Sequence, residues 1–112
     1  MKPKLYIGRY KGRVQEFHPD KDGDFNSFDC VVEFILDGSL KLSYPDSGGE
    51  QVWSGREIAE GHWELSASMG KGKATLHQIA PQSHFLEGTW NDDGYFGMWR
   101  ITLPVDTDDH HV

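Results

Sequence analysis

Hydrophobic and polar residues alternate with a period of two along most of the chain, which is the pattern of half-buried β-strands. In residues 62–69, Trp63, Leu65, Ala67 and Met69 alternate with polar residues. No segment shows the repeat of three to four residues that marks an amphipathic helix. The pattern therefore predicts an all-β fold.

Glycines and prolines divide the chain into short pieces. Eight strands are expected, at residues 5–10 with a continuation over 13–17, and at 28–36, 39–44, 51–57, 62–69, 73–79, 85–90 and 95–103. The segment 28–36 is the most apolar, and Asp37-Gly38 after it is a typical hairpin turn. A second turn is expected at Gly70-Lys71-Gly72.

Short strands joined by short loops favour the pairing of each strand with the next. An open meander of this size leaves two long unpaired edges, which closure removes. We expect an antiparallel up-and-down meander of about eight short strands that closes into a small barrel, with a β-sandwich as the alternative. Gly8, Gly88 and Gly97 lie within the strands, where glycine suits tight bends or close backbone approach.

The length of 112 residues fits one domain. We expect this domain to span residues 1–104, followed by a flexible acidic and histidine-containing tail at 105–112. The formal net charge is −7. Nucleic acid is not an expected partner, because phosphate binding requires clustered Lys and Arg.

Cys30 is the only cysteine, so no intramolecular disulfide can form. The N-terminus shows no apolar signal segment, and no run reaches the roughly 18 apolar residues of a membrane span. These features favour a cytoplasmic protein without a membrane partner. Cys30 shares a strand face with Val32 and Phe34, where it is expected to act as a small hydrophobic residue.

Two segments share the pattern Glu-Gly-x-Trp, at residues 60–63 and 87–90. The second, through Gly88-Thr89-Trp90, resembles the G-x-W motif of lipocalin and avidin-type barrels. In those families the motif lies on the first strand, whereas here it falls on the seventh. Residues 86–94 also resemble one unit of a MORN repeat, a motif that occurs in arrays. Each resemblance covers a short segment, and what it implies is an analogy of barrel architecture.

An acidic segment between the first two expected strands suggests a cation site. Asp20, Asp22 and Asp24 alternate and are followed by Asn26, so oxygen ligands can face one Ca²⁺ ion. The segment begins like an EF-hand loop but has Phe25 where that loop needs glycine. Ca²⁺ is the one candidate cofactor, and the alternative is a polar hairpin loop.

The histidines at His18, His62, His77 and His84 show no metal-ligand spacing. The short glycine turn after the fifth strand is expected to keep His62 away from His77. One functional alternative is a small barrel enzyme in which His77 or His62 acts with Glu64 as an acid–base pair.

Aromatic residues make up 12% of the chain, and most are expected to fill the core. The functional interpretation of the same residues is an apolar pocket that holds a small ligand. Its candidate residues are Trp63, Trp90, Trp99, Arg100 and His77.

The eighth expected strand leaves two alternatives open. If Trp99 points inward, the opposite face of this strand exposes apolar residues and suggests an interface. If that opposite face points inward, Arg100 is buried and needs Glu64, Glu87 or an anionic ligand as its partner.

No catalytic sequence motif is present. The favoured hypothesis is a non-catalytic module that binds a small apolar or anionic ligand, or a protein partner. Self-association into a homodimer is compatible with each alternative, because strands that are apolar on both faces need cover.

Overall fold

The computed structural model describes residues 7–18, 24–46, 49–68, 70–78, 84–92 and 94–104. Over these residues the chain is all-β, as the alternation predicted. The strands are β1 (Gly8–His18), β2 (Asp24–Phe34), β3 (Ser39–Asp46), β4 (Gly49–Ala59), β5 (His62–Ala67), β6 (Lys73–His77), β7 (Phe85–Asp92) and β8 (Tyr95–Thr102). No helix in these ranges is long and apolar enough to cross a membrane.

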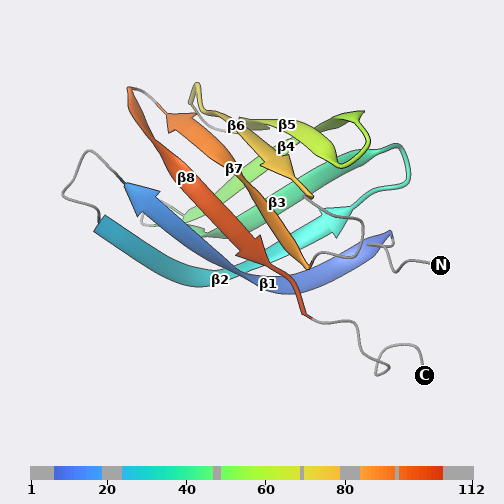
Figure 1. Cartoon of the computed structure of the whole chain (residues 1–112), viewed down its shortest axis with the longest axis horizontal. Helices are drawn as coiled ribbons and strands as arrows, with labels where there is room; N and C mark the ends of the chain where they lie inside the picture. Colours follow the sequence, from blue (N-terminus) through green and yellow to red (C-terminus); the bar gives the residue numbers. More distant parts are fainter. Residues whose placement is uncertain are drawn as a thin grey trace.

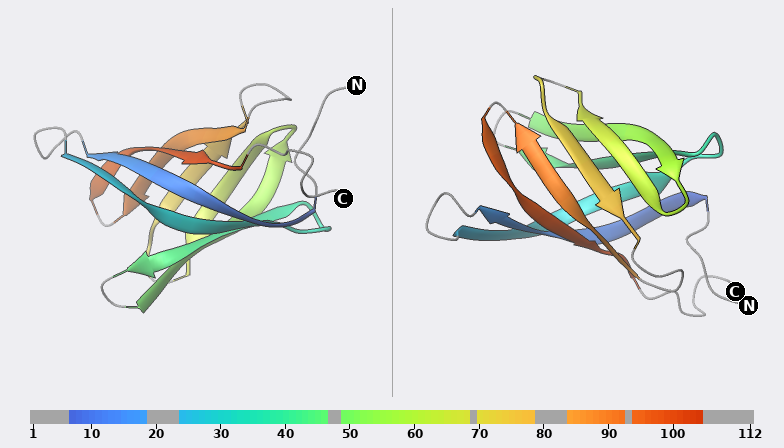
Figure 2. Two further views of the ribbon diagram at one scale, coloured as in Figure 1. Left: turned by 90° about the horizontal axis from the view of Figure 1, so that it is seen from below. Right: turned by 45° about the horizontal axis from the view of Figure 1, so that its top comes forward.

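Each strand pairs antiparallel with the next, and β1 pairs with β8, so the sheet closes into a barrel (Figures 1 and 2). The predicted meander and its closure are confirmed, and the β-sandwich alternative is wrong. β1, β3, β5 and β7 end at one end of the barrel, where β2, β4, β6 and β8 begin. We call this the first end of the barrel, and side chains there form the candidate functional site.

The first hairpin is longer than the sequence predicted. β1 and β2 pair without interruption from Gly8 opposite Phe34 to His18 opposite Asp24. Residues 24–27 were expected to belong to a polar loop, but they form the start of β2. Their polarity is compatible with a strand because the barrel is open to water at this end.

Side chains fill the middle of the barrel. The largest fully buried ones are aliphatic: Leu40, Leu42, Leu65, Leu76, Leu86, Ile101, Leu103, Val14 and Val32. Trp53 and Trp99 are also buried in the core and meet edge to face, with ring centroids 5.3 Å apart. An eight-stranded barrel is just wide enough to be filled in this way, which leaves only its ends for a ligand inside it.

Three glycines allow neighbouring strands to approach closely. A Cβ atom on Gly88 would overlap the carbonyl oxygen of Thr75, and one on Gly97 would overlap that of Phe17. A Cβ atom on Gly55 would likewise overlap the backbone carbonyl oxygen of Glu64. The predicted close approach is therefore confirmed at Gly88 and Gly97. Gly8 differs, since nothing lies near it and its φ of +145° is the reason for glycine there.

Gly88→Ala is expected to destabilise the barrel, because the added methyl group forces β6 and β7 apart. Overpacking of this kind costs about 1–3 kcal/mol, and more where backbone must move. Urea denaturation measures the change, with Ser54→Ala on the exposed face of β4 as the control. Equal stability of the two variants would contradict the close approach.

Burial raises the pKa of the Cys30 thiol to about 12, so it carries almost no thiolate at neutral pH. The native protein is therefore expected to resist a thiol reagent such as DTNB at pH 8. In denaturant the same thiol should react fully within seconds to minutes. Rapid reaction of the native protein would show that this part of the core opens to solvent.

Candidate functional site

The inward face of the barrel changes from apolar to polar at the first end. Glu16 and His18 follow the fully buried Val14 at the spacing of two that keeps strand side chains on one face. Neighbouring strands also place polar side chains there: Asn26, Gln51 and Asp92. These polar side chains are partly or fully exposed, whereas every buried side chain among the described residues is hydrophobic.

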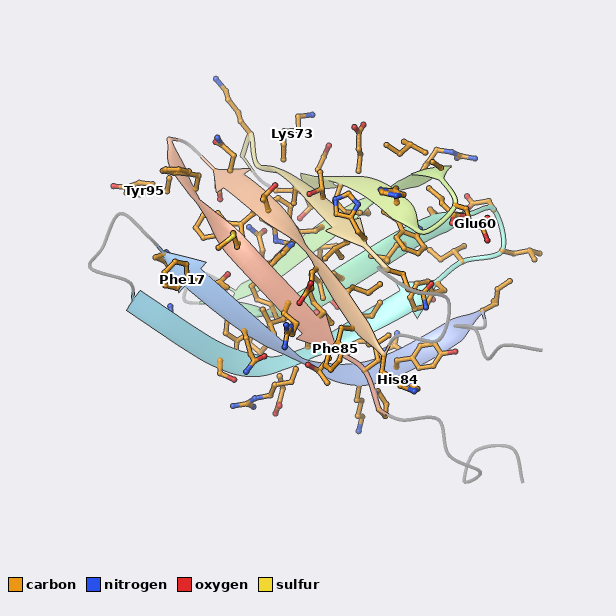
Figure 3. The ribbon with its side chains drawn as sticks, viewed as in Figure 1. Phe17, Glu60, Lys73, His84, Phe85 and Tyr95 are labelled. Atoms are coloured by element: carbon orange, nitrogen blue, oxygen red, sulfur yellow. The ribbon has the colours of Figure 1, made fainter. Side chains whose placement is uncertain are left out.

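These residues line a pocket of about 540 Å³, which we call the mouth. Its aromatic walls come from five strands: Phe28, Tyr44, Trp53, Trp90 and Tyr95. Figure 3 shows Tyr95 at this end of the barrel and Glu60 toward the opposite end. The volume falls within the range of about 300–1,000 Å³ that is typical of small-molecule sites.

Glu16 and His18 form a pair inside the mouth. The Oε1 atom of Glu16 lies 3.1 Å from Nε2 of His18, and the side chains are only 16% and 17% exposed. The His18 ring meets Trp90 edge to face, with centroids 4.9 Å apart. Nδ2 of Asn26 is 3.5 Å from the same His18 nitrogen. These contacts hold the imidazole and the carboxylate in fixed positions.

Two buried polar atoms of mouth residues lack a hydrogen-bond partner within the described chain. They are the indole Nε1 of Trp90, a residue that is 7% exposed, and Oε1 of Gln51. Trp53 differs, because its Nε1 donates to the Tyr44 hydroxyl at 2.9 Å. Each unpaired buried group costs about 1–3 kcal/mol. Both atoms are closed to solvent, so a molecule in the mouth reaches them only when the side chain turns.

The charge of the mouth is acidic. Glu16 and Asp92 contribute carboxylates, whereas neither Lys nor Arg is among its described lining residues. Ser27 is the only lining residue with an aliphatic hydroxyl, and its Oγ accepts a hydrogen bond from Arg13. No Cys is among the described lining residues, and the hydroxyl of Ser27 is engaged with Arg13.

The structure separates the five predicted pocket residues. Trp63 lies at the opposite end of the barrel against Phe34, with ring centroids 5.8 Å apart. Trp99 lies in the core, where its Nε1 donates to the carbonyl oxygen of Thr75 at 3.1 Å. Only Trp90 lines the mouth, since Arg100 and His77 are on the outer face.

Trp99 points inward, so the first alternative for β8 is the one adopted. Phe96 and Met98 are consequently 49% and 51% exposed on the outside. Arg100 is exposed as well and forms a salt bridge with Glu87 on β7. An anion held by a buried Arg100 is therefore excluded by its position.

The expectation that His62 lies away from His77 is wrong. The two residues are direct cross-strand partners, and their Nδ1 atoms lie 2.5 Å apart. The tight turn is the reason: Ala67 N–H bonds to the Gly72 carbonyl oxygen, which leaves both histidines five residues from the turn. The adjacent bond from Gln78 N–H to the Gly61 carbonyl makes them a non-hydrogen-bonded pair, in which side chains are closest.

The enzyme alternative placed His62 or His77 beside Glu64. Glu64 lies opposite Thr75, the next residue pair along the outer face, and neither histidine lines the mouth. Burial lowers the pKa of His77, and the nearby His62 lowers it further through like-charge repulsion.

The proposed calcium segment is described only in part. Asp20 and Asp22 lie outside the described residues, as does the side chain of Asp24, whose backbone starts β2. Asn26 lines the mouth instead. No group of three His, Cys, Asp or Glu side chains in the described ranges is arranged to hold a metal ion.

A larger hollow, about 920 Å³, is a groove lined mainly by outward-facing residues of β5–β8, with Trp90 also among its lining residues. Two pairs of its polar side chains bond to each other: Lys73 to Ser66, and Thr75 to Thr89. The polar side chains on the inward face of the barrel are what favour the mouth as the candidate site.

Sequence reasoning missed Glu16, His18, Gln51 and Asp92 as site residues. A usable signal was present, because Glu16 and His18 continue the inward face that Val14 begins. The alternation stops being apolar there, although the expected strand at 13–17 already includes Glu16. A strand that continues while its inward face turns polar indicates the rim of a barrel.

The pKa of His77 is expected to rise in a His62→Gln variant, because the repulsion from His62 disappears while burial remains. It should stay below the ordinary histidine value of about 6.5. NMR detection of the imidazole carbon-bound protons during a pH titration measures the midpoint. Glu64→Gln on the same outer face is the control, and an unchanged His77 midpoint in His62→Gln would contradict the facing pair.

Comparison of the sequence with protein-family models and with curated proteins finds no match. The resemblances around Gly88-Thr89-Trp90 therefore stay local.

Proposed function

We propose that this protein is a non-catalytic binding module that holds a small molecule in the mouth of its barrel. The observation that carries the proposal is the polar inward face at this end, where Glu16 and His18 are paired at 3.1 Å beside Trp90. A ligand that enters the mouth meets these polar side chains and the aromatic walls together.

The cost of the polar rim supports this function. A carboxylate and an imidazole that face into a barrel destabilise it relative to apolar residues of similar size. The rest of the core shows that this fold can be filled with aliphatic and aromatic side chains alone. Departures from such a pattern tend to occur at functional sites, where stability is lost in exchange for binding.

The architecture of the barrel also supports a binding function. Eight-stranded barrels that bind small ligands hold them at the mouth or in the interior. Here the middle is filled, so a ligand rests on Trp53 and Trp90 and contacts the polar side chains around it. We expect a compact ligand with one ring rather than a long chain.

Trp90→Phe is expected to weaken binding, because the smaller ring removes part of the aromatic wall of the mouth. The probes are 2-phenylethylamine, 2-phenylethanol and phenylacetate, and the readouts are thermal shift and the indole N–H resonances in ¹H–¹⁵N NMR. At least one probe should raise Tm and move the Trp90 resonance.

Trp63→Phe at the opposite end of the barrel is the matched control and should bind like the wild type. The proposal fails if no probe binds at millimolar concentration. It also fails if Trp63→Phe abolishes binding while Trp90→Phe leaves it intact.

A further inference from the structure

We propose that the ligand of the mouth is a small organic cation, an amine whose ammonium group is held by Glu16 and Asp92. This inference rests on the proposed function and specifies its ligand class. The sequence favoured an apolar or anionic ligand. An anionic ligand depended on Arg100, which lies outside the mouth.

The charge around the mouth is unbalanced toward the negative. Glu16 on β1 and Asp92 on β7 both belong to the inward, polar rim, and no described Lys or Arg side chain lines the pocket. Arg100, the cation that would favour an anion, is outside and engaged with Glu87. An anion in the mouth would face two carboxylates, and the net charge of −7 would repel it during approach.

Burial of Glu16 strengthens the same conclusion. Its side chain is 16% exposed, and His18 is the only titratable nitrogen group beside it in the mouth. A carboxylate removed from water needs compensating hydrogen bonds or an opposite charge. An ammonium group supplies both at once, and charge-assisted hydrogen bonds are about twice as strong as neutral ones.

The aromatic walls suit a cation. The rings of Phe28 and Tyr44 pack at 4.7 Å with their planes tilted by 50°, and Trp90 also lines the mouth. The electron-rich faces of such rings attract ammonium groups. Carboxylates at the rim with aromatic walls beside them form a site that selects positive charge attached to an apolar body.

The Gln51 side chain adds detail to the ligand. Its Oε1 is an acceptor without a hydrogen-bond partner among the described residues, and it is closed to solvent. It fits a further N–H of the amine once the side chain turns toward the mouth. The expected class is therefore a compact amine that carries a ring.

The three probes differ mainly in charge, which makes them a direct test. 2-Phenylethylamine is cationic at neutral pH, 2-phenylethanol is neutral, and phenylacetate is anionic. The amine is expected to bind at least about tenfold more tightly than the alcohol, as one charge-assisted hydrogen bond predicts. Phenylacetate should bind more weakly than both.

Glu16→Gln and Asp92→Asn are each expected to reduce the affinity for 2-phenylethylamine about tenfold and to leave that for 2-phenylethanol unchanged. These variants keep the shape of each side chain, and two are used so that a folding defect in one leaves the other as the test. Glu64→Gln, which removes an exposed carboxylate outside the mouth, is the control and should bind like the wild type.

The outcomes separate this inference from the proposed function. The proposal of a cationic ligand is wrong if 2-phenylethanol or phenylacetate binds as tightly as 2-phenylethylamine. It is also wrong if both mouth variants retain full affinity for the amine. In either case the proposed function as a binding module still stands. If none of the three probes binds, the proposed function is wrong as well.

Discussion

Closure of the sheet through the β1–β8 ladder is the constraint on which the rest of this structure depends. Pairing from Arg13 opposite Thr102 to Phe17 opposite Met98 joins the first strand to the last. Closing so few strands forces backbones together, and glycine at Gly55, Gly88 and Gly97 makes the necessary room. The same closure fixes which side chains face inward on every strand. The polar rim is therefore a direct result of how the barrel is closed.

The interior has two zones with different physical roles. Aliphatic side chains in the middle supply the hydrophobic free energy that offsets the conformational entropy lost on folding. At the first end, Glu16 and His18 are largely withdrawn from water although they are polar. They contribute little to stability by being there, and the unpaired Trp90 Nε1 and Gln51 Oε1 subtract from it. Two zones of this kind are expected when a filled barrel supports a binding site at its rim.

The fold could be predicted from local signals because closure and strand order follow from period-two alternation and short turns. Alternation also placed Cys30, Val32 and Phe34 correctly in the core. The site could not be predicted in the same way. Which strands meet at one rim depends on register across several hairpins, and an error of a few residues at the glycine turn misplaced His62 relative to His77. Arg100 shows the same limit, since its surroundings depended on which face of β8 points inward.

Closure also limits how the protein can recognise another chain. Every described strand has a hydrogen-bonded neighbour on both sides over at least part of its length, so free sheet edge is confined to stretches such as residues 24–30 of β2, which pair with β1 but not with β3. Recognition by strand addition relies on main-chain hydrogen bonds and is tolerant of sequence. Over most of its surface this barrel instead presents side chains. A molecule that binds there is therefore selected by the chemistry of those side chains.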